Sequence, residues 1–342
     1  MTLNEVNWGI IGCGNVTERK SGPAFNKVEH SRLVAVMRRN AEKAANYALR
    51  HGVPKYYSDA SQLINDPEVN AVYIATPPDT HALYAIDAMR AGKPVYVEKP
   101  MARNYQECQE MIKVSEETKM PLFVAYYRRT LPAFLKVKEL VENGIIGIPL
   151  TVNIRLNKAF GIKDQFQDQQ TWHTNPEIAG AGHFYDLASH QFDFLDFAFG
   201  PITEIHGIAQ NRAGYYPAED TVSASFTFAS GIVGNGSWCF VVDEGSEEDR
   251  FEITGTKGKI VFSCFALRDV ELITAKGTVN FSFQNPENIS YNLIKQVVYT
   301  LHGEGECVST GYSAARTSWV LEEIVKLYYK KNIHRDIGHI GK

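Results

Sequence analysis

The 342-residue sequence is poor in cysteine, in excess charge of either sign and in long apolar runs. Its five cysteines are scattered and lack the paired short spacings of a zinc site or a redox dithiol, so we expect no metal site. A net charge of -4 provides no broad basic field, which argues against nucleic acid and against an anionic membrane surface as partners. Small-molecule ligands are therefore favoured.

No segment approaches the roughly 18 apolar residues that a membrane span requires. The first residues also lack the positive-then-apolar pattern of a signal peptide. Together with the unpatterned cysteines, this predicts a cytoplasmic protein. A chain of 342 residues exceeds what one hydrophobic core usually organises, so two domains are expected.

Short apolar runs alternate with amphipathic stretches between residues 7 and about 125. This alternation is typical of βαβ units with right-handed crossovers around a parallel sheet. The runs expected to form buried strands are Trp8–Ile11, Leu33–Met37, Val72–Ile74, Val95–Val97 and Leu122–Ala125.

After a helix expected at about 130–142, the sequence becomes β-rich. The segments expected to form a largely antiparallel sheet are Val152–Leu156, Ile202–Ala209, Val222–Phe228, Ile232–Phe240, Phe251–Ile253, Lys259–Phe262 and Val270–Ile273. Further helices are expected at about 184–199 and 314–329. We therefore predict an α/β protein with a first domain at 1–125, a second at 126–312, and a terminal helix at 313–342 that packs back on the first domain.

A glycine-containing turn, Gly12-Cys13-Gly14-Asn15-Val16-Thr17, follows the first expected strand and opens an expected helix. Glycines at such a place permit a tight turn and the close approach of a pyrophosphate to the helix N-terminus. In isolation the motif fits a structural turn better, and Thr17 occupies the third small-residue position. The surrounding βαβ pattern favours a dinucleotide site at Gly12, Gly14, Asn15 and Val16.

Arg38 and Arg39 follow the second expected strand, where a fold that selects NAD offers an acidic side chain to the ribose 2′-hydroxyl. Two guanidinium groups suit a 2′-phosphate instead, through charge-assisted hydrogen bonds. The sequence therefore predicts NADP(H) as the preferred cofactor over NAD(H). The alternative interpretation is a pair of solvated surface arginines.

Glu98-Lys99-Pro100 comes directly after the apolar run that ends at Val97. Open parallel sheets bind ligands at the carboxyl ends of their strands, so a lysine there can hold a substrate oxygen or transfer a proton. The alternative is a lysine that faces water beside a turn-forming proline.

Thr76, Pro77 and His81 belong to the loop after another expected strand, where they could line the cofactor groove. The same loop fits a helix start that is fixed by proline and capped by Asp79 or Thr80, and the two interpretations are compatible.

Asp186, His190 and Asp193 are spaced i, i+4 and i+7, which places them on one face of the expected helix. An aspartate beside a histidine can orient an imidazole that exchanges a proton near neutral pH. The pattern also fits a stabilising contact or two ligands of a metal, for which the sequence shows no convincing third ligand. Trp172 can stack on a ligand or fill the core.

Taken in order, these motifs resemble the glucose-fructose oxidoreductase, inositol dehydrogenase and MocA (Gfo/Idh/MocA) family over nearly the whole chain. The segments that carry the resemblance are Gly12-Cys13-Gly14-Asn15, Ala75-Thr76-Pro77-Pro78 with His81, Glu98-Lys99-Pro100, Gly180-Ala181-Gly182 through Asp186 and His190, and Gly255-Thr256-Lys257-Gly258. The resemblance implies a Rossmann domain followed by an α/β domain with a large, open, mainly antiparallel sheet. It also implies a homodimer or homotetramer that forms through that sheet.

By the same resemblance, Lys99 corresponds to the family's active-site lysine, Asp186 and His190 to its aspartate and histidine, and Glu98 to a residue near the cofactor. Tyr127 fits the position of a loop that reaches the substrate. Arg38 departs from the family pattern, since NAD-using relatives tend to have aspartate there. Ala181 and His173 also depart from it, which leaves the substrate open.

The expected activity is reversible hydride transfer between nicotinamide and a carbinol carbon of a sugar, polyol or related molecule. Lys99, Asp186 and His190 would be catalytic, and Tyr127 and Trp172 would join them at the substrate. One alternative is a glycosidase that acts by transient oxidation and elimination. Another is a non-catalytic sensor of nucleotide or sugar, because fold does not fix function.

Overall fold

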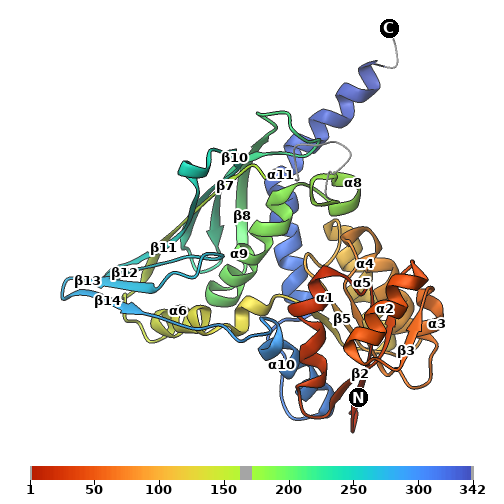
Figure 1. Cartoon of the computed structure of the whole chain (residues 1–342). Helices are drawn as coiled ribbons and strands as arrows, with labels where there is room; N and C mark the ends of the chain where they lie inside the picture. Colours follow the sequence, from red (N-terminus) through yellow and green to blue (C-terminus); the bar gives the residue numbers. More distant parts are fainter. Residues whose placement is uncertain (1, 162–171, 340–342) are drawn as a thin grey trace. The chain divides into compact units, whose positions relative to one another are not determined.

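The structure is a computed structural model that describes residues 2–161 and 172–339, with side chains described as far as residue 330. The chain divides into two compact units (Figure 1). The first comprises Met1–Leu131 and Asn285–Ala315, and the second comprises Pro132–Gln284 and Arg316–Lys342. Each unit contains one of the two sheets.

The first unit is built on a six-stranded sheet in the order β3-β2-β1-β4-β5-β6, in which every neighbouring pair is parallel. Its strands are β1 Val6–Ile11, β2 Ser31–Met37, β3 Lys55–Tyr57, β4 Ala71–Ile74, β5 Val95–Val97 and β6 Leu122–Val124. This is the order of a dinucleotide-binding fold. The expected parallel sheet is confirmed, whereas the edge strand β3 was not predicted because its three residues are polar or half-exposed rather than an apolar run.

Alternate strand residues of this sheet enter two separate cores. One face carries Trp8 and Tyr73 and packs against Leu293 and Val297 of α10. The other face carries Val72 and packs against α4 and α5. The helices of the first unit are α1 Asn15–Arg19, η1 Gly22–Asn26, α2 Ala41–His51, α3 Ala60–Ile64, η2 Pro78–Thr80, α4 His81–Arg90, α5 Tyr105–Thr118, η3 Tyr127–Thr130 and α10 Tyr291–His302.

The second unit contains an eight-stranded sheet in the order β14-β13-β12-β11-β7-β10-β9-β8. Its strands are β7 Pro149–Ala159, β8 Ile202–Gln210, β9 Thr221–Phe228, β10 Val233–Val242, β11 Glu248–Gly255, β12 Gly258–Phe262, β13 Val270–Thr274 and β14 Gly277–Phe281. Neighbours are antiparallel except β7 and β10, which run parallel. The mainly antiparallel sheet predicted from the sequence is therefore confirmed.

Helix α9, His183–Phe199, covers the inner face of this sheet through aromatic contacts. Phe192 meets Phe226 of β9 and Trp238 of β10, with ring centroids 5.3 and 5.6 Å apart. The Trp238 indole nitrogen donates to Gln191 Oε1 at 2.6 Å. A Cβ at Gly236 would lie 2.1 Å from the Trp238 ring, so the glycine makes room for the indole that anchors the helix.

The remaining helices that the structure places wholly in the second unit are α6 Pro132–Glu142, η5 Trp172–Thr174, α8 Pro176–Ala179 and η6 Glu244–Ser246. Helix α11, Gly311–His339, belongs to both units. Its first turn contacts the first unit, since the Tyr312 hydroxyl donates to Glu116 of α5 at 2.6 Å. Further along, a Cβ at Gly207 of β8 would lie 2.2 Å from the Ile324 carbonyl oxygen, so β8 and α11 lie in direct backbone contact.

These units differ from the expected domain bounds. Residues 285–315, which include α10, group with the first unit, and the chain from Arg316 groups with the second. The glycine at position 207 of β8 lets the α11 backbone approach the second sheet. The packing of the terminal helix against the first domain stays a prediction.

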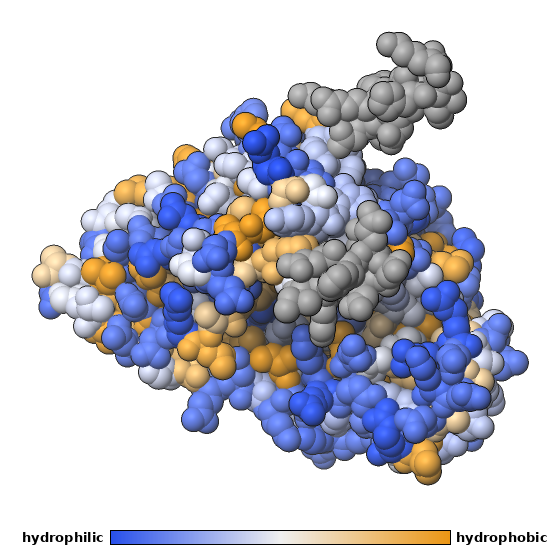
Figure 2. Space-filling view, turned by 45° about the horizontal axis from the view of Figure 1, so that its top comes forward, coloured by the Kyte–Doolittle hydropathy of each residue, from blue (hydrophilic) through white to orange (hydrophobic). Residues whose placement is uncertain are grey.

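The structure describes no helix that is both long enough and apolar enough to cross a membrane. On the face drawn in Figure 2, hydrophilic residues predominate and the hydrophobic residues form scattered patches. Scattered apolar residues of this kind are ordinary on a protein surface.

Candidate active site

Gly12 follows β1 and lies directly against the loop that follows β4. Its φ is +94°, a conformation that favours glycine. An added Cβ would lie 2.7 Å from Thr76 Cγ2 and 2.8 Å from the Thr76 backbone nitrogen. The sequence-predicted residues Gly12 and Thr76 are therefore brought together, and only glycine fits at position 12.

Gly14 precedes α1 and has more room. A Cβ there would meet only the Gly12 carbonyl oxygen, at 3.8 Å, so the space beside Gly14 is open. The buried Thr17 hydroxyl donates to Gly14 O at 2.9 Å and accepts from Gly14 N at 3.0 Å. Thr17, which departs from the usual small residue, thus fixes the turn that carries Asn15 and Val16.

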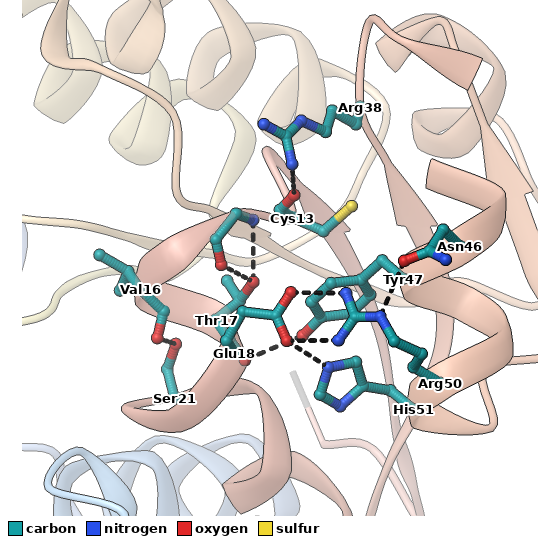
Figure 3. A network of polar contacts seen from close by, with 11 residues as sticks. Cys13, Val16, Thr17, Glu18, Ser21, Arg38, Asn46, Tyr47, Arg50 and His51 are labelled. Carbon is teal, nitrogen blue, oxygen red and sulfur yellow. Dashed lines mark hydrogen bonds and ion pairs between the residues drawn. The ribbon is translucent and has the colours of Figure 1, made fainter. Parts of the chain in front are cut away.

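A polar network ties this turn to α2 (Figure 3). Arg50 donates two hydrogen bonds to Glu18, at 2.7 and 2.8 Å, and the His51 ring lies 2.8 Å from the same carboxylate. These partners, Arg50 foremost, lower the pKa of Glu18 to about 2. The Tyr47 hydroxyl donates to Thr17 O at 2.9 Å, so α2 supports the glycine turn at two points.

Arg38 lies at the same turn. Its guanidinium donates to the Cys13 carbonyl oxygen at 3.4 Å (Figure 3), while its backbone nitrogen donates to Tyr57 of β3. Arg38 is half-buried and Arg39 is exposed. Burial raises the pKa of the Cys13 thiol to about 11, so this cysteine is a neutral part of the turn at physiological pH.

His81 joins two strand-end loops of the first unit. Its Nε2 lies 2.7 Å from Thr76 O and its Nδ1 lies 3.0 Å from Pro100 O. The ring is buried, and burial lowers its pKa. His81 therefore holds the Thr76-Pro77 loop against the turn that carries Lys99. Its predicted place among the cofactor-binding residues stays a prediction.

Glu98 and Lys99 follow β5, at the expected strand end. The Glu98 carboxylate is buried, and burial raises its pKa. It accepts a hydrogen bond from the Tyr73 hydroxyl at 2.6 Å and one from the Lys99 backbone nitrogen at 3.2 Å. The Tyr73 hydroxyl also lies 3.0 Å from the Ser21 hydroxyl. The Lys99 residue is half-exposed, and its backbone nitrogen is part of this hydrogen-bonded turn.

Tyr127 begins η3 in the first unit. The Arg128 guanidinium donates to its hydroxyl at 2.9 Å and lies over its ring, 5.0 Å from the centroid. Arg129 is buried and donates to Val308 O at 2.8 Å. These contacts order the Tyr127 ring, and its place at the substrate stays a prediction.

Asp186 and His190 lie in the first two turns of α9 in the second unit. Asp186 is half-buried, and both His190 and Asp193 are buried. The His190 ring meets Phe265 nearly edge to face, with centroids 6.2 Å apart. Asp249 holds the Phe265 loop by accepting hydrogen bonds from the backbone nitrogens of residues 264–266.

Trp172 is half-exposed and stacks on His173, with ring centroids 3.7 Å apart. His173 in turn lies 6.4 Å from the ring of His183, the first residue of α9. The predicted place of Trp172 at the substrate stays a prediction.

The predicted site residues therefore form two groups. Gly12, Gly14, Arg38, Thr76, His81 and Lys99 lie at the carboxyl ends of β1, β2, β4 and β5 in the first unit. Trp172, Asp186 and His190 lie in the second unit. Their convergence on one substrate stays a prediction. Among the described residues, no group of three or more histidines, cysteines or acids is arranged to hold a metal ion.

Sequence reasoning missed several residues that support these groups: Tyr73 at Glu98, Phe265 at His190, Asp249 in the loop that carries Phe265, and Glu219 at the start of α9. Asp249 and Phe265 lie 59 or more positions from His190, and Glu219 lies in a polar loop (Ala218-Glu219-Asp220) whose residues resemble those of an exposed turn. A buried carboxylate in such a loop leaves no signal in a single sequence.

Comparison with known proteins agrees with this geometry. Residues 6–126 match a family model described as an oxidoreductase family with an NAD-binding Rossmann fold, and residues 134–261 match one described as the GFO/IDH/MocA C-terminal domain. The chain is 37% identical over 309 residues to "Oxidoreductase P35" of Formosa agariphila, a match that covers 89% of this chain and 94% of that protein.

A 1,5-anhydro-D-fructose reductase of Ensifer adhaerens is 26% identical over 313 residues, with 89% of this chain and 90% of that protein covered. A myo-inositol 2-dehydrogenase of Thermotoga maritima is 27% identical over 262 residues, with 74% and 73% covered. Among solved structures, a levoglucosan dehydrogenase in complex with NADH is similar in fold, with a TM-score of 0.86 at 23% identity and coverage of 95% of this chain and 97% of that one.

Proposed function

Because the chain belongs to the Gfo/Idh/MocA family of NAD-binding oxidoreductases, we propose that it transfers a hydride between a nicotinamide cofactor and a carbinol or carbonyl carbon of a sugar or polyol. Relatives that are named for sugar and polyol substrates, the 1,5-anhydro-D-fructose reductase and the myo-inositol 2-dehydrogenase among them, support this substrate class.

One structural observation carries the proposal. β1, β4 and β5 are neighbours in the parallel sheet, and Gly12, Thr76 and Lys99 follow these three strands at the same edge. Ligands of open α/β sheets bind at that edge. A lysine beside a glycine turn there suits a substrate that reacts next to a bound dinucleotide.

The residues present fit a dinucleotide. The open space beside Gly14 lets a pyrophosphate approach the backbone, and a Cβ at that position would enter this space. When bound, the nicotinamide supplies the hydride chemistry. The half-buried Arg38 and the exposed Arg39 follow the second strand, where the ribose of the adenosine half is held in this fold.

The protein's own part is to position the substrate and to exchange a proton. Lys99 would donate a hydrogen bond to the substrate oxygen and stabilise the negative charge that develops on it. His190, oriented by Asp186, would take the hydroxyl proton during oxidation and return it during reduction. Either Lys99 or His190 could be the group that transfers the proton.

The proposal is tested with Lys99→Ala and His190→Ala. Each should lower turnover by about a hundredfold or more while nucleotide binding stays intact. The assay follows nicotinamide absorbance with levoglucosan, myo-inositol, scyllo-inositol and 1,5-anhydro-D-fructose as probes. Full activity in both variants would reject this site.

For the cofactor, the two arginines support NADP(H) over NAD(H). Arg38 is already directed toward the glycine turn, where it contacts the Cys13 carbonyl oxygen. No acidic side chain follows β2 directly, since the next residues are Arg38, Arg39 and Asn40. A guanidinium can bind a 2′-phosphate with two charge-assisted hydrogen bonds.

Fluorescence titration with NADPH and NADH measures this preference. Arg38→Ala should weaken NADPH binding by about tenfold or more, because a hydrogen bond to a charged group contributes about 1.5–3 kcal/mol. NADH binding should change little. Arg32→Ala on the same strand is the matched control, since Arg32 contacts Asn7 and Glu5 instead. A wild-type preference for NADH would contradict the proposal.

We further propose a homodimer or homotetramer that forms through the outer face of the second sheet. That face contains a groove of about 390 Å³ lined by small polar residues and by both charge signs, including Ser225, Arg250 and Glu252. Ile208 and Val233 on the same face are 70% and 46% exposed. A surface with both charge signs can complement a second copy of itself.

Light scattering after size-exclusion chromatography measures the assembly. The wild type should elute as a dimer or tetramer, and Ser225→Arg should shift it toward the monomer by placing a bulky charge in the groove. Gln109→Arg, at an exposed position on α5 of the first unit, adds the same charge away from this face and serves as the matched control. A monomeric wild type would contradict the assembly.

We also propose a cytoplasmic location. None of the five cysteines, all of which lie among the described residues, forms a disulfide. Cysteines without disulfides are typical of a reducing compartment. Fractionation of cells that express the protein tests this location, and recovery outside the cytoplasm would refute it.

A further inference from the structure

A fully buried carboxylate, Glu219, lies at the start of the helix that carries Asp186 and His190. Both of its oxygens accept from the Gly182 backbone nitrogen, at 3.0 and 3.2 Å. Gly182 is the N-cap residue of α9, and its carbonyl oxygen accepts from Tyr185 N in the first helical turn. Glu219 therefore contacts the residue from which the helix begins.

The contact depends on a glycine. A Cβ at Gly182 would lie 2.8 Å from Ala218 Cβ, 2.8 Å from Glu219 O and 3.2 Å from Glu219 Oε1. The backbone of Gly182 is extended, with φ at -95°, so alanine would be tolerated there but for this close approach. A side chain at position 182 would therefore push the start of the helix and the Glu219 loop apart.

One further contact fixes the Glu219 carboxylate, and the neighbouring residue fixes its loop. The Tyr329 hydroxyl of α11 donates to its carboxylate. The adjacent Asp220 accepts hydrogen bonds from the backbone nitrogens of Arg212 and Ala213, which closes the loop between β8 and β9. The carboxylate is therefore held between the N-cap residue of α9 and α11, on a loop that Asp220 closes.

We propose that Glu219, held by Tyr329, is a positioning residue that fixes the start of α9 and thereby the placement of Asp186 and His190. This inference rests on the proposed function, in which Asp186 and His190 must be placed accurately to exchange a proton with the substrate. Asp186 and His190 lie four and eight residues after Gly182, about one and two helical turns further along. A helix that starts in a different place displaces both side chains together.

Electrostatics supports this arrangement. The N-terminal end of a helix favours negative charge, and α9 is 17 residues long. Burial opposes ionisation and raises the pKa of Glu219 to about 7, against the hydrogen bonds from Tyr329 and Gly182, which favour the charged form. The titratable side chains that face it are Tyr329 from α11 and His183 from α9. The contact can therefore change between its charged and neutral forms near neutral pH.

The first test uses the NMR signal of the His190 ring in the full chain labelled with ¹³C-histidine, and it needs no substrate. His190→Gln assigns the signal among the ten histidines. Glu219→Ala and Gly182→Ala should each move the His190 ring signal by more than its linewidth. Glu219→Gln should leave it in place, because glutamine keeps an oxygen acceptor for Gly182 N and can donate to the Tyr329 oxygen.

The second test measures turnover with levoglucosan, myo-inositol, scyllo-inositol and 1,5-anhydro-D-fructose. Glu219→Ala should lower kcat by about 10- to 100-fold, as a misplacement of about 1 Å does, and should leave nucleotide affinity unchanged. Glu219→Gln should restore kcat to within about threefold, and Tyr329→Phe should fall between the two. Asp66→Asn is the control, because it removes a buried, hydrogen-bonded carboxylate of the first unit and should lower stability alone.

The outcomes separate the two proposals. If Glu219→Ala lowers the melting temperature while the His190 signal stays unchanged, Glu219 has only a structural role and the inference is overturned. A glutamine variant as impaired as the alanine variant would overturn it as well. If Lys99→Ala and His190→Ala both keep full turnover, the proposed function fails, yet a shifted His190 signal in Glu219→Ala would still support positioning.

Discussion

The ring of Phe265 meets the imidazole of His190 nearly edge to face, with centroids 6.2 Å apart and the ring planes inclined at 70°. The two residues come from separate elements of the second unit, α9 and the loop between β12 and β13. Asp249 on β11 holds that loop by accepting three backbone hydrogen bonds. The environment of the imidazole is therefore set by a loop whose shape depends on one buried carboxylate.

Phe265→Ala should lower kcat/KM by about 2- to 10-fold, because an aromatic pair contributes about 0.5–1.5 kcal/mol beyond the area it buries. Asp249→Asn should act in the same direction by loosening the loop. Phe199→Leu is the matched control, since it removes the Phe199–Phe228 pair of the same unit away from His190. Steady-state kinetics checks this, and equal losses in the control would show that general destabilisation is responsible.

Gly12 and Gly14 should respond differently to alanine. Gly12→Ala forces a side chain into a positive φ and against the Thr76 backbone, so the melting temperature should fall. Gly14→Ala meets no obstacle and has an extended backbone, so the fold should tolerate it. It should still weaken NADPH binding by about tenfold or more, about 1.4 kcal/mol, because the added methyl occupies the space for the pyrophosphate. Thermal melts and NADPH titration measure both effects. Unchanged NADPH affinity in Gly14→Ala would place the pyrophosphate elsewhere.

The sequence predicted the elements that show a simple period or a strong apolar run. All five strands expected in the first domain are present within a few residues, because Val and Ile runs identify buried parallel strands. Strand β3, Lys55–Tyr57, was not predicted because it is an edge strand of three residues without an apolar run. Tyr291–His302 carries apolar residues at helical spacing (Leu293, Ile294, Val297, Val298 and Leu301) and was nevertheless not identified as a helix.

The contacts beneath the candidate site were less accessible. Lys99 could be placed from its position after Val97, and His190 from its spacing to Asp186. Tyr73, which supports the turn that carries Lys99, lies 26 positions before it in the sequence. Glu219 lies 29 positions after His190. Neither residue belongs to a local pattern. Side-chain hydrogen bonds between distant segments depend on how the elements pack, and a single sequence does not encode that in any short motif.

Tyr73 and Tyr96 stack in the first core with ring centroids 5.0 Å apart, yet their hydroxyls differ. Tyr73 donates to Glu98, whereas the Tyr96 hydroxyl is buried without a hydrogen-bond partner among the described residues. Tyr73→Phe should cost about 1–3 kcal/mol of unfolding free energy by leaving a buried carboxylate oxygen without its donor. Tyr96→Phe should cost close to nothing. Urea unfolding of the two variants measures the difference, and equal costs would contradict the Tyr73–Glu98 hydrogen bond.

Glu219 should make the stability of the second unit depend on pH. Its pKa is raised by burial from 4.5 to about 7, so between these values the folded chain retains a proton that the unfolded chain releases. The contribution of Glu219 to the free energy of unfolding is therefore fully present below about pH 4.5 and is lost as the pH rises toward 7. The loss amounts to at most about 3 kcal/mol. Urea unfolding between pH 5 and 8 should show this slope in the wild type relative to Glu219→Gln, which cannot titrate. Tryptophan fluorescence suits the measurement, since Trp172, Trp238 and Trp319 lie in the second unit and only Trp8 in the first. Parallel pH profiles for the two proteins would mean that Glu219 is ionised throughout this range.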